Sequence, residues 1–191
     1  LINATNVVIS GGVAEKMGGS ARYNTTPFTT DVVGVHDWWP NAFTQSLIAV
    51  TQEGIAYKET AYKTFTPIAT NLGTLDPNIH FVEGGNEESG KDKCLFLFTP
   101  TRQVQVLTGD GTSMSDIAKP ALDWVGSFPS FGILHRSRLF ALKDHVVYIS
   151  KATDHQDFQD ATDSFTQKVF PGEGDHLIGG FIYKGRLYVV K

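Results

Sequence analysis

Four aspartates recur at every third residue in one polar segment, and they are the densest group of side chains with chemical potential in the chain. The segment covers residues 153–163, with carboxylates at Asp154, Asp157, Asp160 and Asp163. Clustered oxygens of this kind are the ligands that calcium prefers. Calcium loops of the EF-hand type, however, place ligands at every second position around a central glycine, and this segment has neither feature. We interpret the segment as a solvated acidic loop and predict no metal site in it.

Histidine, cysteine and serine follow no pattern that marks a catalytic or metal-binding site. The six histidines have no metal-ligand spacing, and the single cysteine, Cys94, allows neither an intrachain disulfide nor a zinc site of several thiolates. The chain has no G-x-S-x-G elbow, P-loop or H-E-x-x-H motif. The glycine-rich stretch 108–112 lies between strand-like segments, which predicts a hairpin turn rather than a phosphate cradle. We predict that the protein is not an enzyme and has no catalytic residues, no cofactor and no metal.

The charge balance argues against a protein built to hold nucleic acid or an anionic membrane. Lysine and arginine number 16 against 20 acidic residues among 191, so the formal net charge is −4, and no basic block is present. The longest apolar run, 94–98, is far shorter than the roughly 20 residues that a membrane helix needs. We therefore expect no membrane span.

Short segments rich in Val, Ile, Thr, Phe and Tyr predict an all-β protein. Glycine, which punctuates such segments, accounts for 19 of the 191 residues. Residues 102–107 and 54–59 alternate in polarity, as a strand with one buried face does. No long stretch has the 3.6-residue period of a helix.

A repeat of about 45 residues organises these segments. Four apolar strands align on Leu47, Leu95, Leu139 and Leu187, with successive separations of 48, 44 and 48 residues. A second strand follows each of the first three after a tight turn, and another strand precedes each of the last three, at 79–82, 131–134 and 177–182. Four short strands in this length match a β-propeller blade, and stacked blades bury both faces of each sheet. We predict an all-β, β-propeller-like fold with four-stranded antiparallel blades.

The predicted blades follow an opening segment. We expect residues 1–40 to form an N-terminal hairpin and an extended connector, and residues 41–191 to form the blades, the last of them incomplete. The chain has no initiator methionine and ends in a strand-like segment, so we expect a fragment of a longer protein. The polar stretch 84–93 is expected to be a flexible loop tip, with a partner contact as the alternative.

Residues 131–158 contain a distinctive pattern of two strands and a loop. It consists of an Arg-x-Arg-Leu-Phe strand, a short turn, a Val-x-Tyr-x-Ser strand and an acidic loop that ends in Asp-Phe. Its residues here are Arg136, Arg138, Leu139, Phe140, Val146, Tyr148, Ser150, Asp157 and Phe158. The segment resembles the podovirus tail nozzle, or tail tubular protein B, and related DNA-stabilisation hub proteins of tailed bacteriophages. Residues 4–19 are also similar to the start of those proteins, with Lys16-Met17-Gly18 where Arg-Pro-Gly is more usual.

This resemblance implies a virion structural protein of a bacteriophage tail, made in the cytoplasm of the bacterial host. It implies a subunit that joins copies of itself in a ring, meets the adaptor, portal and tail proteins, extends the DNA channel and retains the packaged genome. Double-stranded DNA would pass an acidic subunit without specific binding, because phosphate affinity comes from lysine and arginine. The resemblance also implies structural roles: Arg136 and Arg138 would hold neighbouring loops, and Ser150 and Phe158 would terminate and pin the acidic loop.

A ligand- or glycan-binding β-propeller, with or without hydrolytic activity, is the alternative. Loops at one end of a propeller channel can recognise a sugar or a small molecule. Trp38, Trp39 and Trp124 are the side chains that would stack on a sugar ring. For Trp38 and Trp39 we expect packing at a blade junction instead. A cellular protein-interaction propeller is a third interpretation, but no Trp-Asp dipeptide ends the repeats.

Overall fold

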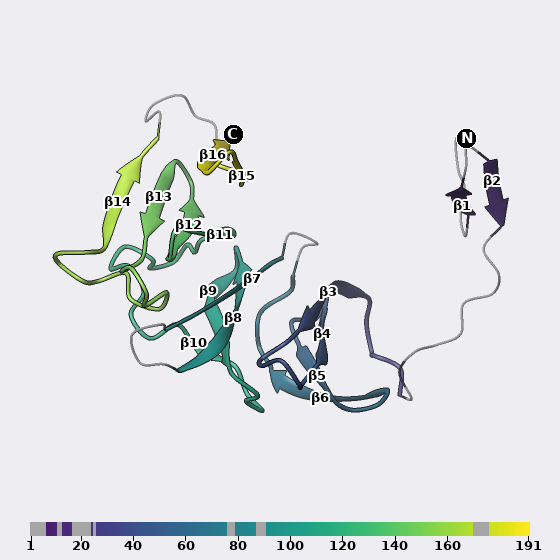
Figure 1. Cartoon of the computed structure of the whole chain (residues 1–191). Helices are drawn as coiled ribbons and strands as arrows, with labels where there is room; N and C mark the ends of the chain where they lie inside the picture. The colour runs from purple at the N-terminus through teal and green to yellow at the C-terminus, as the bar shows by residue number, and fades with distance from the viewer. Residues whose placement is uncertain are drawn as a thin grey trace.

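The computed structural model describes residues 7–10, 13–16, 24, 26–75, 79–86, 91–169 and 176–191. All of the regular secondary structure in these residues is β-strand (Figure 1). The described residues therefore contain no helix that could cross a membrane. The first two strands, β1 (Val7–Ser10) and β2 (Val13–Lys16), pair with each other as an antiparallel hairpin.

Three four-stranded antiparallel sheets follow, each with its strands in chain order. Sheet 1 consists of β3 (Val32–Trp38), β4 (Ser46–Thr51), β5 (Ala56–Ala61) and β6 (Thr64–Ala69). Sheet 2 consists of β7 (His80–Asn86), β8 (Lys91–Thr99), β9 (Arg102–Thr108) and β10 (Ser115–Asp116). Sheet 3 consists of β11 (Phe131–His135), β12 (Arg138–Lys143), β13 (Val146–Ile149) and β14 (Phe165–Lys168). The last two strands, β15 (Gly179–Tyr183) and β16 (Arg186–Val190), form the C-terminal hairpin.

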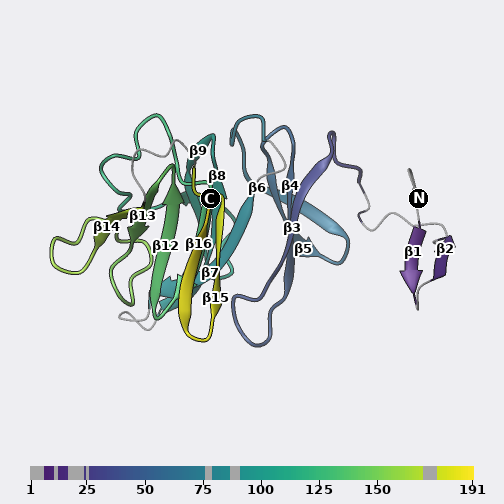
Figure 2. The same ribbon diagram turned by 90° about the horizontal axis from the view of Figure 1, so that it is seen from above.

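This architecture confirms the predicted all-β fold with four-stranded antiparallel, blade-like sheets. The four aligned leucines lie in β4, β8, β12 and β16, the second strand of each successive unit. The predicted turn at 108–112 joins β9 to β10. The sheets stand side by side in chain order, and the described strands do not close a ring (Figure 1, Figure 2).

Two segments differ from the sequence-based expectation. The sheets begin at β3, inside residues 1–40, because Trp38 and its neighbours pair with β4 from Trp38↔Ser46 to Val32↔Thr51. The expected connector is therefore in part the first strand of sheet 1. The polar stretch 84–93 is largely strand as well, since Gly84 pairs with Cys94 and Gly85 with Lys93. Residues 87–90, at the tip of that stretch, lie outside the described residues.

Sheet 2 is buried on both faces, which explains the apolar run 94–98. Leu95 and Leu97 point toward sheet 1, where they pack with Ile48 and Val50. The intervening Cys94, Phe96 and Phe98 belong to the cluster shared with sheet 3, which includes Leu139, Ala141 and Tyr148. Because successive side chains of a strand point to opposite faces, a strand between two sheets must be apolar at every position. The run thus specifies a sheet stacked between two others.

The C-terminal hairpin covers sheet 3 with one face only. Leu177 and Val189 pack in a third cluster with Leu142, Val147 and Ile149. The other face exposes large apolar side chains, and the rings of Phe181 and Tyr188 stack there with centroids 5.2 Å apart. The exposed large apolar residues on this outer face of the hairpin are Phe181, Tyr183, Tyr188 and Val190.

Candidate functional site

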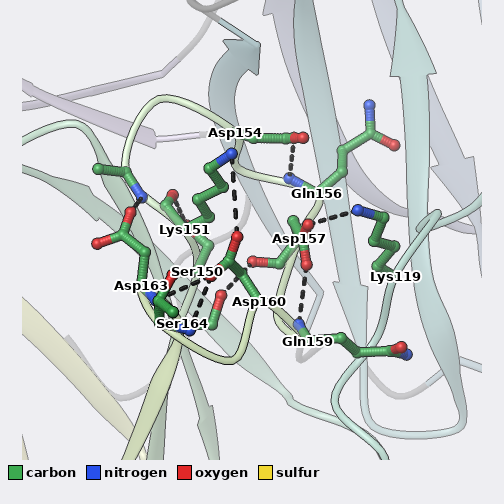
Figure 3. A network of polar contacts seen from close by, with 12 residues as sticks. Lys119, Ser150, Lys151, Asp154, Gln156, Asp157, Gln159, Asp160, Asp163 and Ser164 are labelled. Carbon is green, nitrogen blue, oxygen red and sulfur yellow. Dashed lines mark hydrogen bonds and ion pairs between the residues drawn. The ribbon is translucent and has the colours of Figure 1, made fainter.

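The acidic loop, residues 150–164, connects β13 to β14, and its aspartates bind the loop's own backbone (Figure 3). Asp154 and Asp157 each accept a hydrogen bond from the amide two residues further on, at 3.2 and 2.9 Å. Asp160 accepts from the amides of Thr162 and Asp163, both at 2.9 Å. A carboxylate that caps the backbone two residues later is an Asx turn. The three-residue spacing is therefore that of successive turns, and no group of three or more potential metal ligands occurs among the described residues.

Two cations from outside this loop, Lys119 after β10 and Arg138 in β12, each bind one of its carboxylates. Lys119 Nζ donates to Asp157 Oδ2 at 2.6 Å, and Arg138 donates to Asp163 Oδ1. Burial raises the pKa of Asp157, but hydrogen bonds from Lys119 and the Gln159 amide outweigh it and leave that pKa lowered. The hydrogen bond from Arg138 is the main reason that the pKa of Asp163 is lowered. Both groups are therefore held as carboxylates.

Arg138 and Ser150 tie both ends of the acidic loop to β12. Arg138 donates to the Ser150 carbonyl at 2.9 Å, to the Asp163 carbonyl and to the Asp163 carboxylate. The Leu139 amide donates to Ser150 Oγ, and the Ser150 amide donates to the Leu139 carbonyl, both at 2.9 Å. We call Arg138, Ser150, Asp163 and the loop that they fix the Arg138 clamp.

The remaining residues of the 131–158 pattern lie in the core clusters on the two faces of sheet 3. Phe158 is buried with its ring centroid 4.8 Å from that of Trp124, which also makes an edge contact with Tyr148 at 5.4 Å. Tyr148 donates its hydroxyl to Asp123 at 2.6 Å, and burial followed by this hydrogen bond raises the pKa of Tyr148. Leu139 is fully buried, and Phe140 and Val146 are half-buried against clusters of the core.

Arg136 stands apart from the clamp, in the turn between β11 and β12. Its backbone has a φ of 48°, and its Nη2 donates to the Gly185 carbonyl of the β15–β16 turn at 3.1 Å. The structure thus brings Arg138, Ser150, Asp157 and Phe158 together around one loop and places Arg136 at the C-terminal hairpin. Lys119 and Asp163 complete the arrangement; sequence reasoning did not assign them a contact, because Lys119 lies 38 residues from its partner.

Replacing Arg138 with methionine is expected to lower the free energy of unfolding by about 1.5–3 kcal/mol at pH 7, because a charge-assisted bond to a part-buried carbonyl is lost. The folded pKa of Asp163 lies below its ordinary value of 3.8. Its contribution to stability is therefore present above that pH and lost as the pH falls through the folded pKa. The deficit of the variant should shrink below about pH 4. Urea unfolding at several pH values measures this.

The matched control for Arg138→Met is Arg136→Met. Arg136 donates to a carbonyl and pairs with no carboxylate in the described residues. The loss of unfolding free energy in Arg136→Met should therefore be the same at pH 7 and pH 3. A deficit of Arg138→Met that stays constant over the same range would contradict the role assigned to Asp163.

A cleft of about 600 Å³, the sheet-1 cleft, opens beside β4 and β5 and the turn that follows β9. Asp37 lies in its wall and accepts hydrogen bonds from Gln45 Nε2 at 2.8 Å and Trp39 Nε1 at 3.0 Å, which together lower the pKa of Asp37. The cleft is lined by Asp37, Thr44, Gln45, Ser46, Leu47, Lys58, Glu59, Thr60, Ala61, Tyr62, Asp110 and Thr112.

The buried Lys58 closes the inner wall of this cleft. Its Nζ donates to Asp110 Oδ1 at 2.5 Å, to the Asp110 carbonyl at 3.0 Å and to the Gly111 carbonyl at 3.1 Å. Three donors are all that an ammonium group has. Lys58 therefore joins sheet 1 to the β9–β10 turn and has no donor left for a ligand.

The three tryptophans have different environments. Trp38 is buried between sheets 1 and 2 and donates to the Gly109 carbonyl at 3.1 Å, so its predicted packing at a blade junction is confirmed. Trp124 is buried as well, in the cluster between sheets 2 and 3. Trp39 is 39% exposed, contrary to the packing expected for it. Of the three, Trp39 alone presents its ring to solvent.

Comparison with known proteins returns no relative: no family model, no curated protein and no solved structure matches the chain.

Proposed function

We propose that the protein is part of a virion structural subunit of a bacteriophage tail, within the ring-shaped nozzle or hub that extends the DNA channel and retains the packaged genome. The resemblance of residues 131–158 to podovirus tail nozzles supports this proposal. The observation that carries it is the Arg138 clamp: residues of the family pattern fix a loop to a sheet. This is the use of charged side chains that a rigid channel subunit requires.

The charge distribution suits a channel that DNA passes through. The net charge is −4, and the cations Lys58, Lys119 and Arg138 are each paired with an aspartate of the same chain. Paired cations release few counterions from a DNA backbone, so they contribute little affinity for it. We propose passage of double-stranded DNA without specific binding.

Other copies of the subunit, together with the adaptor, portal and tail proteins, are the proposed partners, and the virion tail is the proposed location. The exposed face of the C-terminal hairpin groups Phe181, Tyr183 and Tyr188 on one surface, against which a further β-sheet can pack. Clustered exposed apolar side chains of this kind mark surfaces that become covered in an assembly.

The test combines native mass spectrometry of the full-length protein with electron-microscopy class averages of particles that contain it. We expect a ring of several copies around an open channel, and antibodies against the protein should label the tail of the particle. A stable monomer that never joins a particle would overturn the proposal.

The alternative of a glycan-binding propeller loses two of its three proposed stacking platforms, because Trp38 and Trp124 are buried. Asp37 in the sheet-1 cleft adds no support to its hydrolytic form, since the hydrogen bonds that lower the pKa of Asp37 disfavour that group as a general acid. We therefore do not propose glycan processing as the function of the protein.

A further inference from the structure

We infer that the sheet-1 cleft binds a neutral saccharide through an aromatic rim and hydrogen-bond acceptors. This site goes beyond the proposed tail role and does not depend on it. Its volume of about 600 Å³ falls in the range of sites for small ligands, roughly 300–1,000 Å³.

The first support is a set of three exposed aromatic residues, one that lines the cleft and two on the neighbouring loop, which we call the aromatic rim. Trp39 is 39% exposed, Phe43 96% and Tyr62 76%. Tyr62 lines the cleft, Phe43 precedes the lining residue Thr44, and Trp39 is bonded to the lining residue Asp37. The Lys63 ammonium lies 4.9 Å from the Tyr62 ring centroid, and most of that residue still faces solvent. Aromatic rings left outside the core at one place indicate a contact surface.

The second support is that the loop bearing Trp39 and Phe43 is already ordered. Asn41 Oδ1 accepts hydrogen bonds from the amides of Phe43 and Thr44, both at 2.9 Å. Asp37 holds Trp39 with one carboxylate oxygen and Gln45 with the other. A pre-formed loop loses less conformational entropy when a ligand binds.

The third support is the chemistry of the lining, which defines the ligand class. The lining carries three carboxylates, on Asp37, Glu59 and Asp110, and one cation, Lys58, whose donors are all engaged. Such a surface repels phosphates and acidic sugars. It offers acceptors to a ligand that is rich in donors, and the hydroxyls of Thr44, Ser46, Thr60 and Thr112 add groups that both donate and accept. A neutral sugar presents hydroxyl donors at its edge and an apolar C–H face for the aromatic rim.

The test is a fluorescence titration, because Trp39 is the exposed tryptophan of the three and donates a hydrogen bond to Asp37 in the wall of the cleft. The probes are maltohexaose, cellohexaose, mannohexaose and chitohexaose, with sialyllactose as an acidic sugar and spermine as a polyamine. We expect at least one neutral hexasaccharide to change the emission and to protect Trp39 from acrylamide quenching. Isothermal titration calorimetry then gives the dissociation constant.

Variants assign the binding to the cleft. Gln45→Ala and Trp39→Ala should each raise the dissociation constant about tenfold. Tyr183→Ala, which changes an exposed aromatic residue of the C-terminal hairpin, should leave the dissociation constant unchanged. Circular dichroism melting checks that each variant is folded. The two cleft variants, Gln45→Ala and Trp39→Ala, should assemble as the parent does, which separates this test from that of the tail role. The inference is overturned if no neutral hexasaccharide binds at about 10 mM, roughly 2.7 kcal/mol of affinity. Binding by sialyllactose or spermine alone would also overturn the inference. So would a loss of affinity in Tyr183→Ala equal to the loss in the two cleft variants.

Discussion

Phe96→Ala is expected to lower the free energy of unfolding by about 3–5 kcal/mol. Phe96 is fully buried in β8, in the cluster that joins sheet 2 to sheet 3. Truncation removes the transfer free energy of the ring and leaves a cavity between two sheets that can collapse only in part. Domains of this size have a total stability of about 5–15 kcal/mol, so the variant should be marginal. Urea unfolding followed by circular dichroism measures the loss.

The control for this substitution is Phe43→Ala, since Phe43 is almost fully exposed in the loop before β4. Its effect on stability should stay within about 0.5 kcal/mol. Similar losses in both variants would show that burial between the sheets does not set the contribution of Phe96.

Gly132→Ala is expected to cost about 1–3 kcal/mol through overpacking. Gly132 lies in β11, and a methyl group added there would lie 2.3 Å from both Cε2 and Cζ of Phe98. Phe98 is fully buried in β8, so the ring can move away only by displacing its neighbours in the core. The glycine therefore allows sheet 3 to approach sheet 2. Thermal unfolding by calorimetry and urea unfolding should both show the loss.

Two variants test the steric origin of that loss. Gly179→Ala, also in a strand, adds a methyl group whose nearest neighbour, Phe131 Cε2, is 3.9 Å away, and its cost should stay within about 0.5 kcal/mol. Adding Phe98→Leu to Gly132→Ala should give a combined loss smaller than the sum of the single losses, since the leucine leaves room for the methyl group. Strict additivity would rule out a clash between these positions.

A cation joins each unit to the next. Lys58 of sheet 1 binds the β9–β10 turn, and Lys119, which follows sheet 2, binds Asp157 in the acidic loop of sheet 3. Arg136 of sheet 3 binds the turn of the C-terminal hairpin. These contacts lie at the turns, outside the apolar clusters, and restrict sliding of one sheet against the next. They fit a protein whose role depends on a rigid stack of sheets.

The amino-acid sequence by itself determined the all-β class and the order of most strands. Local patterns suffice for this, because a run such as 94–98 or an alternation such as 102–107 specifies a strand without reference to distant residues. The aligned leucines also recovered the length of the repeat, since each occupies the same strand of its unit. The turn at 108–112 followed from its glycines.

Other strands depended on pairing and could not be read locally. β14 (Phe165–Lys168) is exposed at all four positions, and it is a strand because it pairs with β13 from Val146↔Lys168 to Ile149↔Phe165. β3 likewise mixes polar and apolar residues, and its register with β4 makes it a strand. Backbone hydrogen bonds to a neighbour, rather than local propensity, decide such edge strands.

The candidate sites depended on the tertiary structure most of all. The three-residue spacing of aspartates suits either ligands or Asx turns, and only the folded loop shows each carboxylate on a nearby amide. Trp38 and Trp39 are adjacent residues of the same type, so the sequence alone does not distinguish them. Neighbouring side chains of an extended chain point to opposite sides, and for this reason Trp38 is buried and Trp39 is exposed. The sheet-1 cleft joins Asp37, Lys58 and Asp110, which are far apart in the chain. Chemistry at such a site arises from long-range packing, which no local pattern encodes.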